Sequence, residues 1–203
     1  MVFPYFAQPD RFAAFLDGET ACACCRQSKR CLDAAIFYGA ETIDAICPDC
    51  LAGGRLKERD IFTCAGDVEA LSRQIQDLHP GWSAAAVEKA VAEKTEILEK
   101  TTPPVVNWQD WPWPCADGDY GTFIGFGSKP LYNRLAKDMN GFALFQDSRY
   151  ESDEEKPDGN ELWTESLPDS EIGDLAASLA FATLFYVFEN RSTGRLVTVW
   201  DRL

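Results

Sequence analysis

Two pairs of cysteines with the same short spacing constrain this chain more than any other feature. Cys22 and Cys25 form one Cys-x-x-Cys pair, Cys47 and Cys50 form the other, and 21 residues separate them. Two residues between cysteines let a tight turn, or knuckle, direct both sulfurs toward one ion. Two knuckles together supply a tetrahedral set of four thiolates. The spacing therefore predicts a zinc site that holds a small N-terminal module together.

The wider cysteine content allows a second explanation. The chain has eight cysteines, an even number that would also suit four disulfides in an exported protein. Its opening residues, MVFPYFAQPDRF, lack the cationic start, apolar stretch and cleavage site of a secretory signal. We therefore expect a cytoplasmic protein with reduced thiols. Metal binding is then favoured over a redox-active dithiol and over buried cysteines without a ligand.

Four sulfur ligands would fill the coordination shell of zinc and leave no position for a reactive water. We therefore expect one structural zinc and no catalytic metal. Cys24 lies between the first two ligands and could replace either of them. Cys31 and Cys64 fit small buried apolar residues better than ligands, because free cysteine usually plays that part in a protein core.

The charge of the chain limits its partners. Its 203 residues include 19 basic and 33 acidic side chains, a net charge of -14. The acidic side chains concentrate after residue 66, so a nearly neutral N-terminal part precedes an acidic body. Such a balance opposes nucleic-acid binding, since each phosphate requires a cation. No apolar run approaches the roughly 20 residues that a membrane span needs. A basic protein is the expected partner.

The body shows helical and strand patterns in alternation. Residues 67–79 place Leu71, Ile75 and Leu78 on one helical face, with Asp67 as the N-cap. A second helix is expected from Ser83 to the prolines at 103–104, and a third over 169–181.

Strands are expected in three places: at 35–39, at 123–127, and in a terminal hairpin over 184–201. We therefore predict an α+β protein. A zinc-knuckle module at residues 1–66 packs against an acidic body at 67–203, which consists of helices and a small antiparallel sheet. The two parts could also form one continuous domain.

Several motifs stand in a fixed order along most of the chain. They are Phe3-Pro4-Tyr5-Phe6, the knuckle 22–25, Cys47-Pro48-Asp49-Cys50-Leu51-Ala52-Gly53-Gly54, Trp108-Gln109 and Trp113-Pro114-Cys115. This order resembles the CbrC family of small bacterial proteins, whose name is tied to tolerance of a colicin. The resemblance implies zinc binding and implies no agreed enzymatic activity. Asp49, Leu51 and Gly53 depart from the family's usual second knuckle, CPWCIADG.

The resemblance also implies that one metal site has been lost. Family members carry His-Cys and a further cysteine after the Trp-Gln segment, and a Cys-x-x-Cys-Gly knuckle between their last two strands. Here Pro114 stands in place of the histidine, so Cys115 alone remains of the His-Cys pair. Residues 189–194 stand in place of the knuckle. Misalignment of a divergent C-terminal segment would give the same pattern, so that alternative stays open.

Two features of the body suggest partner-binding surfaces. The segment 147–159 is strongly acidic, and Glu151, Asp153, Glu154 and Glu155 lie within it. It fits a solvated loop, or a surface that steers a basic protein. Trp111 and Trp113 alternate with prolines in a rigid strap, which could pack on the core or anchor an interface.

Together these features favour a zinc-stabilised protein-binding protein, and a concrete version is an immunity protein that neutralises a basic protein toxin. One alternative is a purely structural zinc adaptor. Another is an enzyme with a pocket of scattered residues, for which Asp117, Asp119 and Tyr120 are candidates. The only histidine, His79, has no paired serine or cysteine motif. We therefore expect no enzyme.

Overall fold

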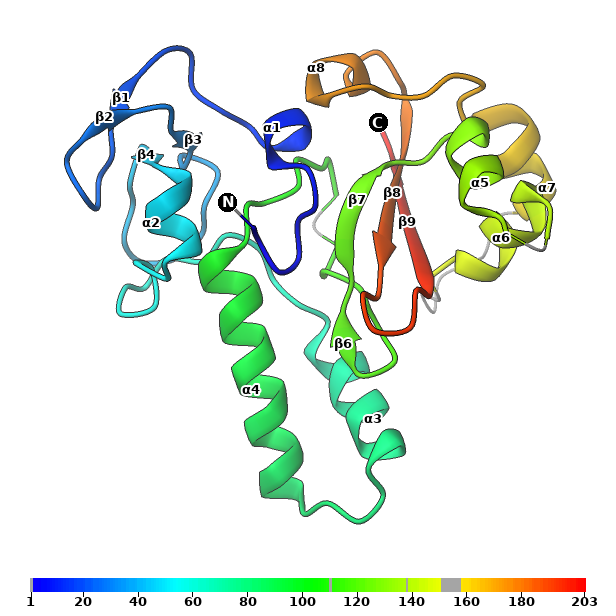
Figure 1. Cartoon of the computed structure of the whole chain (residues 1–203), viewed down its shortest axis with the longest axis horizontal. Coiled ribbons are helices and arrows are strands. Elements are labelled where there is room, and N and C mark those ends of the chain that lie inside the picture. Colours follow the sequence, from blue (N-terminus) through cyan, green and yellow to red (C-terminus); the bar gives the residue numbers. More distant parts are fainter. Residues whose placement is uncertain (1, 110, 138, 151–157) are drawn as a thin grey trace.

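The structure is a computed structural model, and it describes residues 2–109, 111–137, 139–150 and 158–203. It confirms an α+β protein (Figure 1). The cysteine-rich N-terminal part lies at one end, and a three-stranded sheet with short helices lies at the other. Two longer helices project together from between them. Among the described residues, no helix combines the length and the apolar character needed to cross a bilayer.

The N-terminal part consists of short elements joined by turns. Strands β1 and β3 pair antiparallel with β2 and β4, respectively. In chain order the elements are α1 (Pro9–Phe12), β1 (Thr20–Ala21), β2 (Ser28–Lys29), β3 (Leu32–Asp33), β4 (Ala45–Ile46) and α2 (Pro48–Ala52).

The strand predicted at residues 35–39 is wrong. The Ala35 N–H donates to the side chain of Asp33, which starts a turn, and only Tyr38 forms a bridge, with Phe62. The backbone N–H of Tyr38 and that of Phe62 each donate to the other's carbonyl at 2.8 Å. One residue pair therefore takes the place of a strand.

The two projecting helices confirm their predicted start signals. Helix α3 (Val68–Leu78) begins where the Asp67 carboxylate accepts from the Ala70 N–H at 2.9 Å. Helix α4 (Ala84–Thr101) begins where the Ser83 hydroxyl accepts from the Ala86 N–H. Each cap satisfies a backbone donor that the helix itself leaves free.

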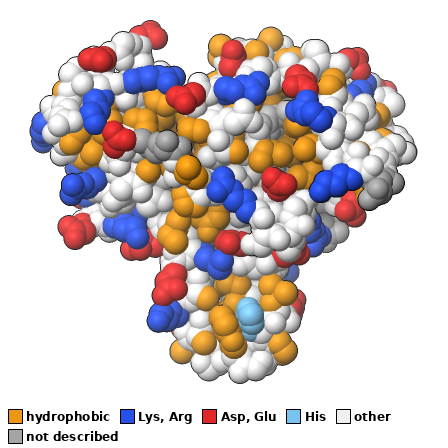
Figure 2. Space-filling view, viewed as in Figure 1, with side chains coloured by type: hydrophobic (Ala, Val, Ile, Leu, Met, Phe, Trp, Pro, Cys, Tyr) orange, Lys and Arg blue, Asp and Glu red, His pale blue; other side chains and the backbone are white. Residues whose placement is uncertain are grey.

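The free end of this helical pair is partly apolar. Leu71 and Ile75 of the predicted stripe are buried, but Leu78 is 54% exposed because it lies near this end. Trp82, in the connecting turn, is 43% exposed, and its ring stacks on His79 at a centroid distance of 4.1 Å. Figure 2 shows hydrophobic side chains gathered around the histidine there.

The body is built on an antiparallel sheet, which confirms the predicted strand at 123–127 and the predicted terminal hairpin, and its strand order is β7-β8-β9. These strands are β7 (Thr122–Phe126), β8 (Thr183–Glu189) and β9 (Leu196–Arg202), and the separate pair β5 (Cys115–Ala116) and β6 (Asp119–Tyr120) precedes them. The remaining helices are α5 (Lys129–Leu135), α6 (Gly141–Ser148), α7 (Gly159–Glu161), the π-helix η1 (Leu162–Ser166) and α8 (Leu175–Ser178).

The long helix predicted over 169–181 is wrong, since only α8 is helical there. Gly173 disfavours a continuous helix, and the Asp174 carboxylate caps a new one by accepting from the Ala177 N–H at 2.8 Å. The residues before this cap therefore stay outside the helix.

The N-terminal segment packs directly on the sheet of the body. The Ala7 N–H donates to the Phe123 carbonyl, and the Phe123 N–H donates to the Tyr5 carbonyl, both at 2.9 Å. Phe3 and Phe6 are each 1% exposed and belong to the same buried cluster as the cysteine-rich part and the sheet. One hydrophobic cluster therefore runs from the knuckles into the body, and a second packs between the sheet and helices α5 and α6.

Candidate metal centre

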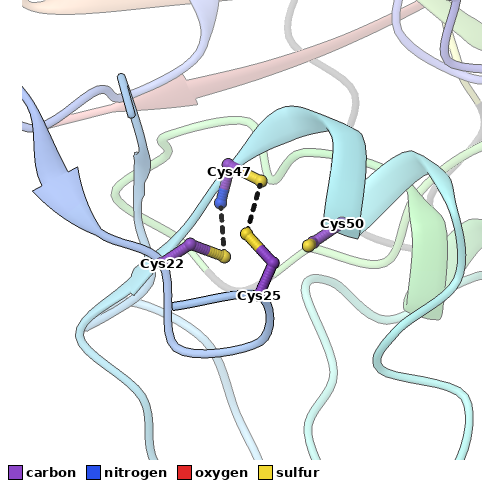
Figure 3. A group of neighbouring side chains, drawn as sticks. All are labelled: Cys22, Cys25, Cys47 and Cys50. Atoms are coloured by element: carbon purple, nitrogen blue, oxygen red, sulfur yellow. Dashed lines mark hydrogen bonds between the residues drawn. The ribbon is translucent and has the colours of Figure 1, made fainter. Parts of the chain in front are cut away.

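The structure brings the four predicted cysteines together. The Sγ atoms of Cys22, Cys25, Cys47 and Cys50 all lie within 4.8 Å of one another (Figure 3). Those of Cys25 and Cys47 are 3.9 Å apart. Sulfurs at the corners of a tetrahedron around zinc are separated by about 3.8 Å, given a Zn–S bond of about 2.3 Å. The observed set is therefore already close to the size that a tetrahedral metal ion requires.

Each knuckle is formed by local backbone hydrogen bonds. In the first, the Arg26 N–H donates to the Cys22 carbonyl, and Arg26 has a φ of 63, which turns the chain sharply. In the second, Cys47 is the N-cap of α2, and the Cys50 N–H donates to its carbonyl at 3.0 Å. Pro48 occupies the first helical turn, where its missing N–H costs nothing.

The two knuckles also contact each other. The Cys47 N–H donates to Cys22 Sγ at 3.3 Å, as Figure 3 shows. Burial opposes ionisation of the Cys22 thiol, but the backbone N–H groups of Cys47, Cys25 and Cys24 lower its pKa to about 6. The lowered pKa favours the thiolate form of Cys22, which is the form that binds metal.

At two other cysteines of the cluster, the pKa shifts upward instead. Burial outweighs the hydrogen bonds that lower the pKa of Cys47, and burial together with the neighbouring sulfurs raises that of Cys50. Both side chains are almost completely enclosed, with exposed fractions of 0% and 7%. A bound cation would remove this penalty, because it stabilises all four thiolates at once.

The other cysteines lie outside the four-sulfur group. Cys31 is fully buried, donates to the Thr20 carbonyl at 3.4 Å and has its pKa raised to about 11 by burial, which fits the predicted apolar role. Burial raises the pKa of Cys24, and the nearby Arg59 guanidinium offsets part of that rise. No motif links Arg59 to the knuckles, so its place beside Cys24 is visible only in the folded chain. None of the eight cysteines, all of which lie in the described part of the chain, forms a disulfide in the structure.

The predicted partner surface is described only in part. Glu151, Asp153, Glu154 and Glu155 lie outside the described residues. Trp111 is half-buried, and its indole donates to Asp201 Oδ2 at 3.3 Å.

Trp113, the other strap residue, is 2% exposed, so its side chain offers almost no surface to a partner. Its indole N–H donates to the Gly121 carbonyl at 2.8 Å. Its ring also meets that of Phe188 edge-on, at a centroid distance of 5.1 Å. These contacts correspond to the core-packing alternative for the tryptophan strap.

The three candidate catalytic residues all make structural contacts. Asp117 pairs with Arg195 at 3.2 Å, and Asp119 pairs with Lys94 at 3.0 Å. Tyr120 is 2% exposed, and its hydroxyl lies 3.0 Å from that of Thr95. These contacts join the β5–β6 pair to the terminal hairpin and to α4.

The two segments implied to hold a second metal site do lie side by side. Asn190, in the turn between β8 and β9, donates from its amide to the Ala116 carbonyl at 2.6 Å. Thr193 donates to Asp117 at the same distance. The neighbouring Cys115 is 1% exposed and contacts the Asp67 carbonyl at 3.9 Å. Polar side chains thus connect the segments, with Cys115 as the one cysteine in either of them.

Comparison with known proteins places the chain in a family. Residues 1–166 match an uncharacterised protein family, UPF0167, and this range includes both knuckles, the helical pair and the tryptophan strap. No solved structure matches the chain. The match does not extend to the CbrC name, which remains an expectation from the motifs. Because the match covers most of the sequence, the chain belongs to the uncharacterised protein family UPF0167.

Proposed function

We propose that this chain is a zinc-stabilised protein-binding protein whose metal is structural. The observation that carries the first half is the group of four sulfurs within 4.8 Å of one another. Tetrahedral sets of four sulfurs suit zinc or an iron–sulfur centre. Two knuckles with this spacing are typical of structural zinc, which supplies folding free energy and no reaction.

The residues around the cluster support a closed site. Cys22, Cys47 and Cys50 are buried, and the exposed Cys25 completes the set from the surface. The Cys47 N–H donates a hydrogen bond to the Cys22 sulfur. A contact of this kind orients a ligand in the absence of the metal. With four thiolates on the ion, no coordination position is left for water or substrate.

Elemental analysis of the purified chain tests the metal. We expect about one zinc per chain, and we expect Cys47→Ser to lose it and to destabilise the N-terminal part, since structural zinc contributes about 10 kcal/mol or more to folding. Cys64→Ser is the matched control, because its sulfur accepts from the Thr63 hydroxyl at 3.7 Å and lies outside the cluster. Bound iron, two zincs, or fully folded protein without metal would each contradict the proposal.

The second half of the proposal is a basic protein partner, with an immunity protein against a basic toxin as its concrete version. The support is the net charge of -14, concentrated after residue 66. Each candidate catalytic residue already makes an ion pair or a part-buried hydrogen bond with a neighbouring element, which favours binding over catalysis. An acidic surface speeds the encounter with a basic protein, and salt weakens that attraction.

Stopped-flow kinetics with the partner co-purified from the cells of origin tests this half. We expect the association rate to fall as ionic strength rises from about 0.01 to 0.1 M, where the Debye length shrinks from about 30 to 10 Å. A quadruple amide variant at Glu151, Asp153, Glu154 and Glu155 should slow association and leave zinc content unchanged. Amides at the exposed Glu69, Glu88 and Glu93 provide the control.

Two outcomes would contradict the binding proposal. An association rate that does not respond to salt or to the quadruple variant would show that the acidic segment plays no part in the encounter. Turnover of a substrate by the isolated chain would favour the enzyme alternative instead.

A further inference from the structure

The body contains a cavity of about 340 Å³ that none of the four clustered cysteines lines. Four segments far apart in the sequence form its walls. They are α3 with its cap Asp67, β5, residues 147–150 at and after the end of α6, and residues 195–197 at the start of β9. Helix α3 and strand β9 both contact β5, and in Figure 1 the turn between β8 and β9 lies beside β6. Its volume falls within the range of about 300–1,000 Å³ that small-molecule sites usually have. We name it the α3 pocket.

The floor of the α3 pocket is apolar. It consists of small or aliphatic side chains that are at most 8% exposed, namely Ala70, Cys115, Ala116, Leu196 and Val197. Burial raises the pKa of the Cys115 thiol to about 11, so this group is neutral at pH 7. The floor therefore suits the hydrocarbon part of a ligand.

The hydrogen-bond acceptors inside the α3 pocket already have donors. The Tyr150 hydroxyl donates to Asp67 Oδ2 at 2.7 Å, and Asp67 Oδ1 accepts from the Ala70 N–H. The Ser148 hydroxyl donates to the Phe145 carbonyl at 2.9 Å. A ligand that offers acceptors leaves these bonds in place, whereas a ligand that offers donors would have to share oxygens that already accept a hydrogen bond.

Three arginines stand on the walls, Arg73, Arg149 and Arg195. Arg195 is held by Asp117, and Arg149 donates to the Gln146 side chain at 3.1 Å. Arg73 forms no hydrogen bond or ion pair within the described part of the chain.

Two exposed carboxylates, Asp77 and Asp147, share the rim of the α3 pocket with the arginines. With the Asp67 carboxylate they balance the three arginines, so the α3 pocket carries no net negative charge in a chain whose net charge is -14. A free guanidinium presents a planar pair of donors that matches the two oxygens of a carboxylate. Arg73 is therefore the group best placed to bind an anionic ligand.

We propose that the α3 pocket binds a small organic carboxylate. Its apolar part lies on the floor beside Cys115 and Leu196, and its carboxylate pairs with the Arg73 guanidinium. This site is separate from the cysteine cluster and goes beyond the proposed protein-binding function. It gives the body a small-molecule specificity that neither the zinc nor the acidic segment supplies.

Three probes with one hydrocarbon body and different head groups test the proposal: 4-phenylbutyrate, 4-phenylbutanol and 4-phenylbutylamine. Their dissociation constants are measured by ligand-observed NMR on the full-length zinc-loaded chain at low salt. We expect the carboxylate to bind at least about tenfold more tightly than the alcohol, since hydrogen bonds between charged groups are worth that factor or more. The amine should bind no more tightly than the alcohol.

Two variants locate the binding. Arg73→Gln should weaken the carboxylate about tenfold and leave the alcohol unchanged. Ala70→Leu fills the floor while keeping a good helix former in α3, so it should weaken both probes. Arg55→Gln is the matched control, because this exposed arginine lies in the cysteine-rich part, outside the α3 pocket.

Thermal unfolding of each variant checks that the fold is intact. The proposal is overturned if the carboxylate binds more weakly than about 10 mM, or no more tightly than the alcohol. It is also overturned if Arg73→Gln and Arg55→Gln have equal effects. Binding that survives in folded Ala70→Leu would place the ligand elsewhere and would contradict the site.

Discussion

Replacing Lys100 with methionine removes a buried ammonium group that joins the cysteine-rich part to α4. Lys100 is 7% exposed, and its Nζ donates to the carbonyls of Arg59 and Ile61 at 2.8 and 2.7 Å. The same Nζ lies 3.5 Å from the centre of the Phe62 ring. Methionine has nearly the same length, so the variant loses these polar contacts while it fills most of the same space.

The expected loss follows from these contacts. Hydrogen bonds to a charged group contribute about 1.5–3 kcal/mol each, and a cation–π contact contributes about 1 kcal/mol. The two bonds share one ammonium group, and burial lowers the pKa of Lys100, which shows that the charge is costly to enclose. The lower values sum to about 4 kcal/mol, and the cost of enclosing the charge reduces this sum, so we expect Lys100→Met to lower the free energy of unfolding by about 3 kcal/mol.

Urea unfolding of the zinc-loaded chain at pH 7 measures this difference. The control is Lys89→Met on the same helix, where the side chain is 77% exposed and pairs with Glu93 at 3.8 Å. Such a surface pair contributes at most about 0.5 kcal/mol. Equal stability of the Lys100→Met variant and the wild type would refute the reasoning, because it would mean that the cost of burying the charge cancels the contacts.

Three further predictions concern single positions. Burial raises the pKa of Glu99, whose carboxylate accepts from the Gly66 N–H at 3.3 Å, so ionisation of Glu99 above its ordinary pKa of 4.5 costs stability. Glu99→Gln should therefore be at least as stable as the wild type at pH 7, with the difference disappearing below pH 4.5 in thermal unfolding. Cys115→Ser should leave the zinc content unchanged in elemental analysis, because its sulfur lies outside the cluster. Gly39→Ala should lower the free energy of unfolding by about 2 kcal/mol or more in urea, because Gly39 has a φ of +127 and an added Cβ would lie 2.0 Å from the Asp60 carbonyl oxygen.

The features that the sequence predicts well are those that depend on near neighbours in the chain. The spacing of Cys22 with Cys25 and of Cys47 with Cys50 fixes two tight turns, and each turn already directs its sulfurs the same way. The caps at Asp67 and Ser83 work in the same manner, since a side-chain oxygen reaches a backbone N–H three residues ahead.

The predictions that fail relied on apolar patterns without such local support. The apolar run at 35–39 suits a strand, but the hydrogen bond from Ala35 to Asp33 turns the chain first. The apolar face over 169–181 suits a long helix, but Gly173 and the Asp174 cap delay it until Leu175. In both cases a local polar contact outweighs a weak periodicity, and in the second case Gly173 adds to its effect.

Asp67 shows why the cysteine cluster was visible in the sequence while the α3 pocket was not. Its Oδ1 caps α3 through a contact within three residues, and a sequence pattern captures that role. Its Oδ2 accepts from the Tyr150 hydroxyl, 83 residues away, and this bond forms part of the pocket wall. No sequence pattern links Asp67 to Tyr150. The two residues meet only because the fold brings α3 beside the residues that follow α6. A site whose ligands come in close pairs is recorded in the local sequence, whereas a site assembled from four distant segments exists only in the folded chain.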